Sequence, residues 1–155
     1  MNALATKVGR RLKRARARLV TAESCTGGWV SQAVTAISGS SAWFERGFVT
    51  YSNAAKRELL GVKKKTLHTF GAVSEETARE MAKGALKKSH GTIAVAVTGV
   101  AGPGGGTPAK PVGMVCFSWA TTRKLWSETR RFRGNRESVR RQSVVHALKG
   151  VLERG

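Results

Sequence analysis

The chain has 155 residues, 41% of them hydrophobic, which suffices for one domain with a buried core but includes no apolar run of membrane-spanning length. Lysine and arginine number 28 against nine glutamates and no aspartate, so the net charge is +19, and Asp-containing triads and Asp-based magnesium sites are excluded. The two cysteines are too few for a disulfide framework, and we therefore expect a cytoplasmic protein without membrane contact.

The first part of the chain predicts alternating helices and strands. Apolar residues at helical spacing between Leu4 and Ala15, surrounded by lysine and arginine, indicate an amphipathic helix with a basic outer face. The elements expected after it are a strand over 18–22, a helix ending near 38, a strand over 43–51, short helices over 54–60 and 63–70, and a longer helix from Ser74 to about His90.

The second part begins with a wholly apolar run over 92–98, which is typical of a central strand covered on both faces. A glycine-rich loop follows over 99–108. Two antiparallel strands are expected over 112–120 and 125–132, and a final helix is capped by Gly134-Asn135. This order predicts one α/β domain over 1–155, a three-layer α/β/α sandwich with a mixed, mostly parallel sheet.

Polar residues follow three of the predicted strands at their carboxyl ends. They are Glu23-Ser24, Tyr51-Ser52-Asn53 and Thr98-Gly99. In open α/β sheets the ligand lies beyond the carboxyl ends of the strands. We therefore expect these three strand ends to converge on one site.

The turn at residues 21–29 is the first candidate for chemistry. Ser24 lies between a strand and a helix whose first N–H groups are expected to be free, and these would stabilise an oxyanion beside a serine nucleophile. Gly27 and Gly28 let the backbone approach a ligand closely. An ordinary helix N-cap is the structural alternative for Ser24. Cys25, with a pKa lowered by the helix N-terminus, is a second candidate nucleophile and ranks below Ser24.

Lys56 is the candidate general base. With Asn53 as the N-cap, Lys56 falls in the first turn of its helix, where the dipole and burial would lower the pKa of its amine. A serine–lysine pair is a known substitute for serine–histidine. The alternative is a lysine that points into water. Tyr51 would hydrogen-bond the nucleophile or the leaving group, or be a half-buried strand residue, and Glu23 would orient the substrate or Lys56, or merely end its strand.

Two further features suit an anionic ligand. The glycine loop lacks the terminal Gly-Lys-Ser/Thr of a Walker A motif and is followed by a strand, so it is neither a P-loop nor a dinucleotide fingerprint, but it can wrap a ligand with Lys110 near its rim. Arg136 and Arg140 share one helix face and would clamp a phosphate. A solvated basic surface, shared with Arg130, Arg131, Arg133 and Arg141, is the alternative. The scattered histidines His68, His90 and His146 predict no metal site.

In combination, the motifs resemble one known family. The segments that carry the resemblance are Ala22–Gly28, Gly47–Asn53 with Lys56, Gly71–Ser74, Thr98–Pro103 with Gly105 and Gly106, Lys110–Gly113, and Arg136 with Val139–Arg141. They are similar to the C-terminal domain of the CinA (competence/damage-inducible) family, whose stand-alone members are PncC-type nicotinamide-nucleotide amidohydrolases. The similarity covers about residues 4–152.

The resemblance implies hydrolysis of the carboxamide of nicotinamide mononucleotide to nicotinate mononucleotide and ammonia, without a metal or an organic cofactor. It implies Ser24 as nucleophile and Lys56 as base, with Tyr51 and Thr98 as supporting residues. It also implies a site arginine, for which Arg136 and Arg140 both fit. The candidate substrate-binding residues are Glu23, Cys25, Thr26, Gly27, Gly28, Asn53, Gly99, Gly102, Arg136 and Arg140.

The expected partner is a small phosphorylated substrate, and we also expect a homo-oligomer, with a dimer as the first choice. The competing hypothesis is a nucleic-acid-binding or competence-associated accessory module without catalysis, based on the basic first helix and the region from Arg123 to Arg141. It predicts salt-dependent binding to DNA that is indifferent to Ser24. A third hypothesis is that the fold is kept and catalysis is lost.

Overall fold

The computed structural model describes all 155 residues, Met1–Gly155. The elements in chain order are α1 (Asn2–Ala15), β1 (Leu19–Glu23), α2 (Trp29–Thr35), the 3-10 helix η1 (Ser40–Ala42), β2 (Phe44–Val49), α3 (Asn53–Leu60), α4 (Lys64–Phe70), α5 (Glu75–Lys87), β3 (Ile93–Gly99), β4 (Met114–Thr121), β5 (Leu125–Arg131) and α6 (Arg136–Arg154). None of the helices combines the length and hydropathy that crossing a bilayer requires.

The five strands form one sheet in the order β2-β1-β3-β4-β5. β1 pairs in parallel with β2 and with β3, whereas β4 is antiparallel to β3 and β5 is antiparallel to β4. Four strands therefore share one direction and β4 opposes them, which confirms the mixed sheet. Because β1, β2 and β3 are parallel neighbours, their carboxyl ends meet at the same edge of the sheet, as predicted.

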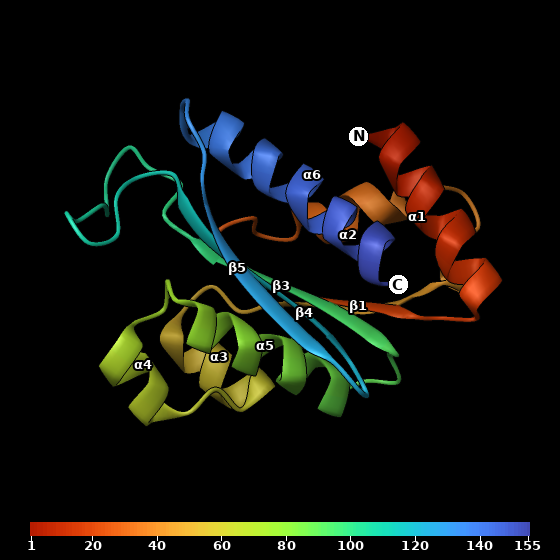
Figure 1. The fold of residues 1–155 in the computed structure, drawn as a ribbon, viewed down its shortest axis with the longest axis horizontal. Coiled ribbons are helices and arrows are strands. Elements are labelled where there is room, and N and C mark those ends of the chain that lie inside the picture. The colour runs from red at the N-terminus through yellow and green to blue at the C-terminus, as the bar shows by residue number, and fades with distance from the viewer.

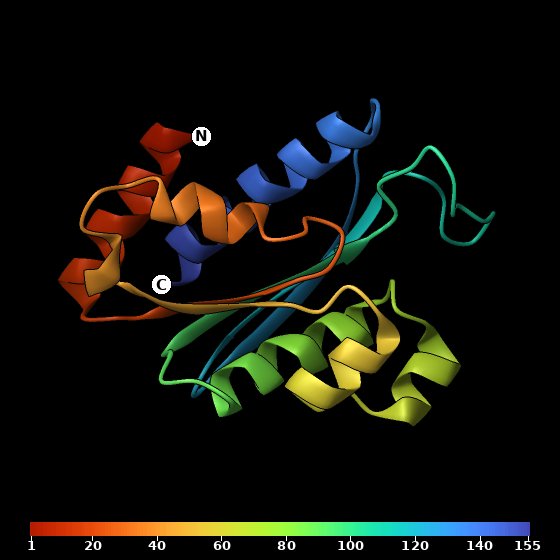
Figure 2. The ribbon, with the colours of Figure 1, turned by 180° about the vertical axis from the view of Figure 1, so that it is seen from behind.

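Helices cover both faces of the sheet, and this confirms the three-layer architecture. Figure 1 shows α1, α2 and α6 on one side and α3, α4 and α5 on the other, and the reverse view in Figure 2 shows the same two layers. The glycine-rich loop between β3 and β4 projects from the end of the sheet at which β1 and β3 finish. This end is where the candidate site lies.

The alternation of side chains along β3 explains the two covered faces. Ile93, Val95 and Val97 pack into a core of 21 buried residues beneath α1, α2 and α6. Ala94 and Ala96 point into a second core of 10 residues beneath α3 and α5. Larger side chains thus fill the first interface, and alanines let α5 approach the sheet closely on the second.

The boundaries differ from the predicted ones in two informative places. The helix after the Ser24 turn ends at Thr35 rather than near residue 38, because the chain turns at Gly39, which has a φ of 77°, and then forms η1. Within the expected Ser52-Asn53 cap, the N-cap of α3 is Ser52, whose hydroxyl accepts a hydrogen bond from Ala55 N, and not Asn53, from which the position of Lys56 was counted. Lys56 consequently lies one position further into the helix than expected.

Candidate active site

Ser24 lies in the turn that leaves the central part of the sheet. Its backbone N–H donates to Val97 O on β3 at 2.9 Å, which ties the turn to the neighbouring strand. The turn closes through Gly27 and Gly28, with φ angles of 58° and 100°, a left-handed conformation that residues with a side chain rarely adopt. α2 begins only after Gly28, which is its N-cap without a side-chain bond. Ser24 is therefore not the N-cap of this helix, and the interpretation of Ser24 as an ordinary N-cap is wrong.

Glu23 is completely buried, and its carboxylate turns back toward the start of α2. It accepts five hydrogen bonds, of 2.7 to 3.1 Å, from Thr26 Oγ1, Gly28 N, Val30 N, Ser31 N and Ser31 Oγ. The prediction that these helix N–H groups are free for an oxyanion was wrong, because this carboxylate occupies them. Glu23 points neither at the pocket nor at Lys56.

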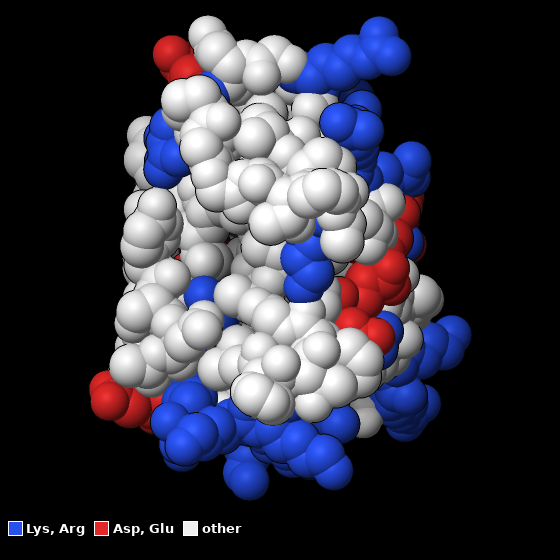
Figure 3. All heavy atoms as spheres, turned by 90° about the vertical axis from the view of Figure 1, so that its left-hand side faces the viewer, with Lys and Arg blue, Asp and Glu red and all other residues white.

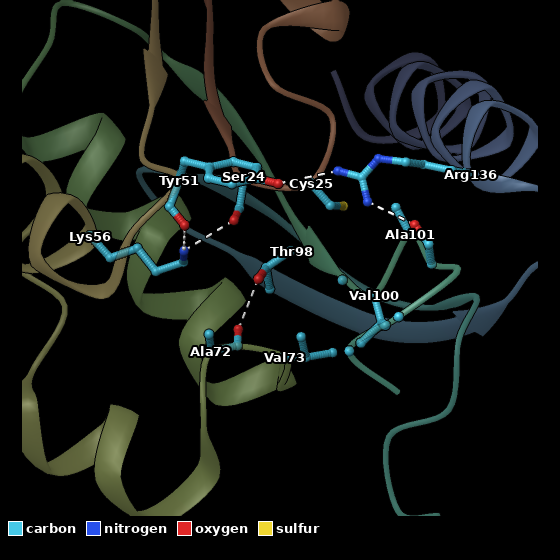
Figure 4. Close-up of a pocket in the computed structure, with 14 residues that line it drawn as sticks. Ser24, Cys25, Tyr51, Lys56, Ala72, Val73, Thr98, Val100, Ala101 and Arg136 are labelled. Carbon is cyan, nitrogen blue, oxygen red and sulfur yellow. Dashed lines mark hydrogen bonds between the residues drawn. The ribbon is translucent and has the colours of Figure 1, made fainter. Parts of the chain in front are cut away.

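Lys56 reaches from α3 to the nucleophile candidate, and only 1% of it is exposed. Its Nζ lies 3.0 Å from Ser24 Oγ, 2.9 Å from Thr50 O and 3.3 Å from Tyr51 O, as Figure 4 shows in part. The alternative of a lysine pointing into water is therefore wrong. Burial lowers the pKa of the Lys56 ammonium group.

The partners of Lys56 suit both protonation states of its amine, because the charged group donates its three hydrogens to Ser24 Oγ, Thr50 O and Tyr51 O. A neutral amine has two N–H bonds and one lone pair, and two backbone carbonyls, Thr50 O and Tyr51 O, stand ready to accept the two hydrogens. In that form the lone pair would face Ser24 Oγ, to which Nζ donates when the amine is protonated. No carboxylate forms a salt bridge with Lys56. The arrangement can therefore draw a proton from the serine.

A cavity of about 300 Å³ opens beside this pair. Its lining comes from the ends of β1 and β3, the segment after β2, the α4–α5 connection, the glycine-rich loop and α6. The lining residues are Ser24, Cys25, Tyr51, Lys56, Ala72, Val73, Thr98, Gly99, Val100, Ala101, Gly102, Gly104, Gly105 and Arg136. The three predicted strand ends thus do converge on one cavity.

Tyr51 and Arg136 form the outer rim of the cavity. Arg136 donates from Nη2 to Tyr51 Oη at 3.2 Å and from Nη1 to Gly102 O at 2.8 Å (Figure 4). Tyr51 is 63% exposed, so the alternative interpretation of a half-buried strand residue is wrong. Its hydroxyl accepts a hydrogen bond from Arg136 and makes none with Ser24. Arg136 places the only guanidinium group among the residues that line this cavity.

Arg140 lies behind the turn instead of in the cavity. Its Nε donates to Cys25 O at 3.0 Å and its Nη2 to Thr26 O at 3.1 Å. The guanidinium also lies over the Trp29 ring, 5.3 Å from its centroid. The two arginines that the sequence left as alternatives therefore have different positions: Arg136 lines the cavity and Arg140 holds the turn.

Thr98 and Cys25 both line the cavity and are both buried. Thr98 Oγ1 donates to Ala72 O at 2.8 Å and so fixes the α4–α5 connection against the end of β3. Burial raises the pKa of the Cys25 thiol to about 12, the reverse of the lowered value that a cysteine nucleophile needs. The thiol stays protonated at neutral pH, which favours Ser24 over Cys25.

The remaining predicted residues lie outside the cavity lining. Asn53 is exposed at the first position of α3, and Thr26, Gly27 and Gly28 belong to the turn behind the cavity. Lys110 turns away to donate to Phe70 O at the end of α4. Ala72 and Val73 line the cavity but were not predicted as site residues. The sequence feature that could have identified them is the segment Gly71–Ser74, which carried part of the family resemblance.

Figure 3 looks onto the end of the sheet at which the cavity opens. Basic side chains gather along the lower border of this face, over α3 and α4, while its centre is mostly uncharged. No group of three or more histidine, cysteine or glutamate side chains that could hold a metal ion lies anywhere in the structure.

Known proteins resemble this chain over nearly its whole length. The family model described as the CinA C-terminal domain matches residues 1–154. The chain is 53% identical to a protein of Pseudomonas putida named nicotinamide-nucleotide amidohydrolase PncC, over 98% of this chain and 95% of the relative. It is also 53% identical to the protein of that name from Escherichia coli K12, over 97% of this chain and 92% of the relative.

A solved structure extends the likeness to three dimensions. The competence/damage inducible protein CihA of Agrobacterium tumefaciens superposes with a TM-score of 0.96 at 45% identity, covering 98% of this chain and 93% of that one. A match over nearly the whole chain in sequence and in fold leaves one conclusion: this chain belongs to the CinA C-terminal domain family.

Proposed function

We propose that this chain hydrolyses the carboxamide of nicotinamide mononucleotide to nicotinate mononucleotide and ammonia, with Ser24 as nucleophile and Lys56 as general base. The observation that carries the mechanism is the 3.0 Å contact between Lys56 Nζ and Ser24 Oγ at the wall of the cavity. The relatives named as nicotinamide-nucleotide amidohydrolases, at 53% identity over nearly the whole chain, support the choice of substrate.

The first half of the reaction forms an acyl-enzyme. The neutral Lys56 amine takes the Ser24 hydroxyl proton while Oγ attacks the amide carbon, so that a C–O bond forms and the carbonyl π electrons move to oxygen. When this tetrahedral intermediate collapses, the C–N bond breaks and the ammonium group of Lys56 returns the proton to the departing nitrogen. Ammonia leaves, and an ester with Ser24 remains.

The second half repeats the steps with water. Lys56 takes a proton from a water molecule, whose oxygen attacks the ester carbon, and then returns the proton to Ser24 Oγ as the ester C–O bond breaks. The products are nicotinate mononucleotide and the free enzyme. Because Lys56 starts and ends each half neutral, its lowered pKa suits both roles.

The rest of the cavity suits the two ends of the substrate. Ala72, Val73, Val100 and Ala101 offer apolar surface to the pyridine ring. Arg136 offers a guanidinium group for the phosphate, because charge-assisted bonds to phosphate are the strongest that arginine makes. Thr98 supports the wall that carries Ala72. Asn53, which lies outside the lining, has no role in this scheme.

Product analysis tests the proposal directly. Purified protein incubated with nicotinamide mononucleotide should release ammonia and nicotinate mononucleotide in equal amounts, and nicotinamide riboside, which lacks the phosphate, should react far more slowly. A folded protein that leaves the mononucleotide unchanged would contradict the proposal.

A second candidate function rests on α1. α1 and the short segment after it carry seven exposed basic side chains, none of which takes part in a salt bridge. They are Lys7, Arg10, Arg11, Lys13, Arg14, Arg16 and Arg18. The apolar side of α1 is already buried through Val8 and Leu12, so this helix keeps no free apolar face for a membrane. This cationic row favours nucleic-acid binding through the phosphate backbone as an additional activity, and we propose it alongside hydrolysis.

Three smaller expectations stay proposals. We propose that residues 1–155 act as one domain, that the protein is a homo-oligomer and that it is cytoplasmic. Sedimentation of the purified protein tests the second, and fractionation of cells tests the third.

A further inference from the structure

Most of the backbone N–H groups of residues 24–31 already have a hydrogen-bond acceptor. Six of the eight donate within the turn, to the neighbouring strand or to the Glu23 carboxylate. The acceptors are Val97 O for Ser24, Ser24 O for Gly27, Thr26 O for Trp29, and the Glu23 carboxylate for Gly28, Val30 and Ser31. Only the N–H groups of Cys25 and Thr26 donate no hydrogen bond.

Two bonds decide where these two N–H groups point. In a trans peptide the C=O and the N–H point in opposite directions, and the only cis peptide in the chain is Gly102-Pro103. The Thr26 N–H shares its peptide with Cys25 C=O, which accepts from Arg140 Nε. The Cys25 N–H shares its peptide with Ser24 C=O, which accepts from Gly27 N. Each free N–H group therefore points away from the donor that binds the carbonyl of the same peptide.

Opposite charges hold the two sides of this turn. On one side, Glu23 binds the donors at the start of α2 and is completely buried. On the other side, Arg140 binds the carbonyls of Cys25 and Thr26 and lies over Trp29. Arg140 does not line the cavity. Its hydrogen bonds reach the site through the carbonyls of the turn.

We propose that Glu23 and Arg140 are positioning residues that fix the turn so that the free N–H group of Cys25, next to Ser24 at the cavity, receives the oxyanion of the tetrahedral intermediate formed on Ser24. The inference rests on the proposed amidohydrolase function. Glu23 occupies the donors at the α2 N-terminus, and Thr26 lies outside the cavity lining, so the N–H group of Cys25 is the donor that the turn has left for the developing charge. Cys25 itself lines the cavity next to Ser24.

The experiment compares Arg140→Met and Arg140→Lys with wild type, and uses Arg141→Met as the matched control. Arg141 also lies over Trp29, 5.7 Å from the ring centroid, but is exposed and makes no bond to the turn. Ammonia release from nicotinamide mononucleotide supplies kcat and KM, and thermal unfolding supplies Tm.

We expect Arg140→Met to lower kcat by at least about tenfold, and by up to roughly a hundredfold, because removing one oxyanion donor costs about 10²–10³ in kcat and misdirecting it costs less. KM should stay within about threefold of wild type. Arg140→Lys, which keeps a cation that can bind one carbonyl, should recover part of the loss. Arg141→Met should behave as wild type.

Four results would overturn the inference, and they can be told apart. Unchanged kcat with a lowered Tm would show that Arg140 only stabilises the fold. Raised KM with unchanged kcat would make it a phosphate ligand. If wild type releases no ammonia, both the proposed function and this inference are wrong. If all variants release ammonia with the same kcat as wild type, only this inference is wrong. If Arg140→Met does not fold, Arg140→Lys supplies the comparison.

Discussion

Lys56 shows how one residue acquires its chemistry from its surroundings. From its position in the sequence, Lys56 is expected near the start of a helix, where the helix dipole would contribute to a lowered pKa. With Ser52 as the cap, the helix start is one residue further away, and burial is the main cause of the lowered pKa. Spacing along the chain cannot predict burial of this kind, because it depends on how α3 packs against the Ser24 turn.

The pH dependence of activity follows from this pKa. The working form of Lys56 is the neutral amine, so kcat/KM should rise with pH through the lowered pKa of this group and then level off. Lys56→Met should lack measurable activity at every pH. A pH profile measured on the wild type checks the first expectation, and a rate without an acidic limb would point to a different base.

The same shift makes a prediction about stability. Because the pKa of Lys56 is lower in the folded chain than the ordinary value of 10.5, the unfolded chain binds more protons at pH values between the two. The free energy of unfolding of wild type, measured relative to Lys56→Met, should therefore increase as pH rises through this window and become constant above it. Urea titrations of both proteins at several pH values measure this difference. A difference that falls with rising pH would contradict it.

Arg136 is the residue expected to recognise the phosphate. Replacement by alanine should raise KM for nicotinamide mononucleotide by roughly 10- to 100-fold, since a charge-assisted pair is lost, and should change kcat much less. Arg133→Ala, an exposed arginine outside the cavity lining, is the control. An unchanged KM in Arg136→Ala would assign the phosphate to another part of the cavity.

At the scale of elements, the start of α2 shows what sequence patterns can and cannot reveal. The strand–turn–helix order and the need for two glycines were predicted, and both were confirmed. The sequence did not reveal that Glu23 folds back over the helix start, because a carboxylate after a strand can point to either side. Arg136 and Arg140 were ambiguous for a related reason: they are four residues apart on the same face of α6, a rise of about 6 Å along its axis.

Glu23 should be essential for the stability of this element. Glu23→Gln replaces an acceptor of five hydrogen bonds by an amide whose nitrogen cannot accept, so we expect a loss of about 2–4 kcal/mol in the free energy of unfolding. Glu58→Gln, at an exposed position of α3, should change it by less than about 0.5 kcal/mol. Chemical denaturation compares the two. Equal stabilities would mean that the carboxylate does not hold α2.

At the scale of the whole molecule, the site depends on topology. Ser24, Tyr51 and Thr98 are far apart in sequence and meet because β1, β2 and β3 are parallel neighbours. Alternating strands and helices were sufficient to predict this convergence. The different contacts of Arg136 and Arg140, by contrast, depend on how α6 packs across the sheet, which no local pattern encodes.

The distribution of charge separates the two proposed activities. α1 contributes nothing to the cavity lining, so its cations can be changed without touching the site. Replacing Arg10 and Arg14 by glutamine should weaken binding to duplex DNA and reduce the slope of log K against log salt by roughly two, with ammonia release unchanged. Lys83→Gln with Lys87→Gln on α5 is the control, and equal losses in both pairs would indicate attraction by net charge alone.

The most direct test of the central claim is ammonia release from nicotinamide mononucleotide by wild type and by Ser24→Ala, together with calorimetric binding of the same substrate to both. We expect release by wild type only, with similar affinities in the two proteins, because the alanine keeps the cavity and removes the nucleophile. Release at an equal rate by folded Ser24→Ala would contradict the assignment of Ser24 and with it the mechanism.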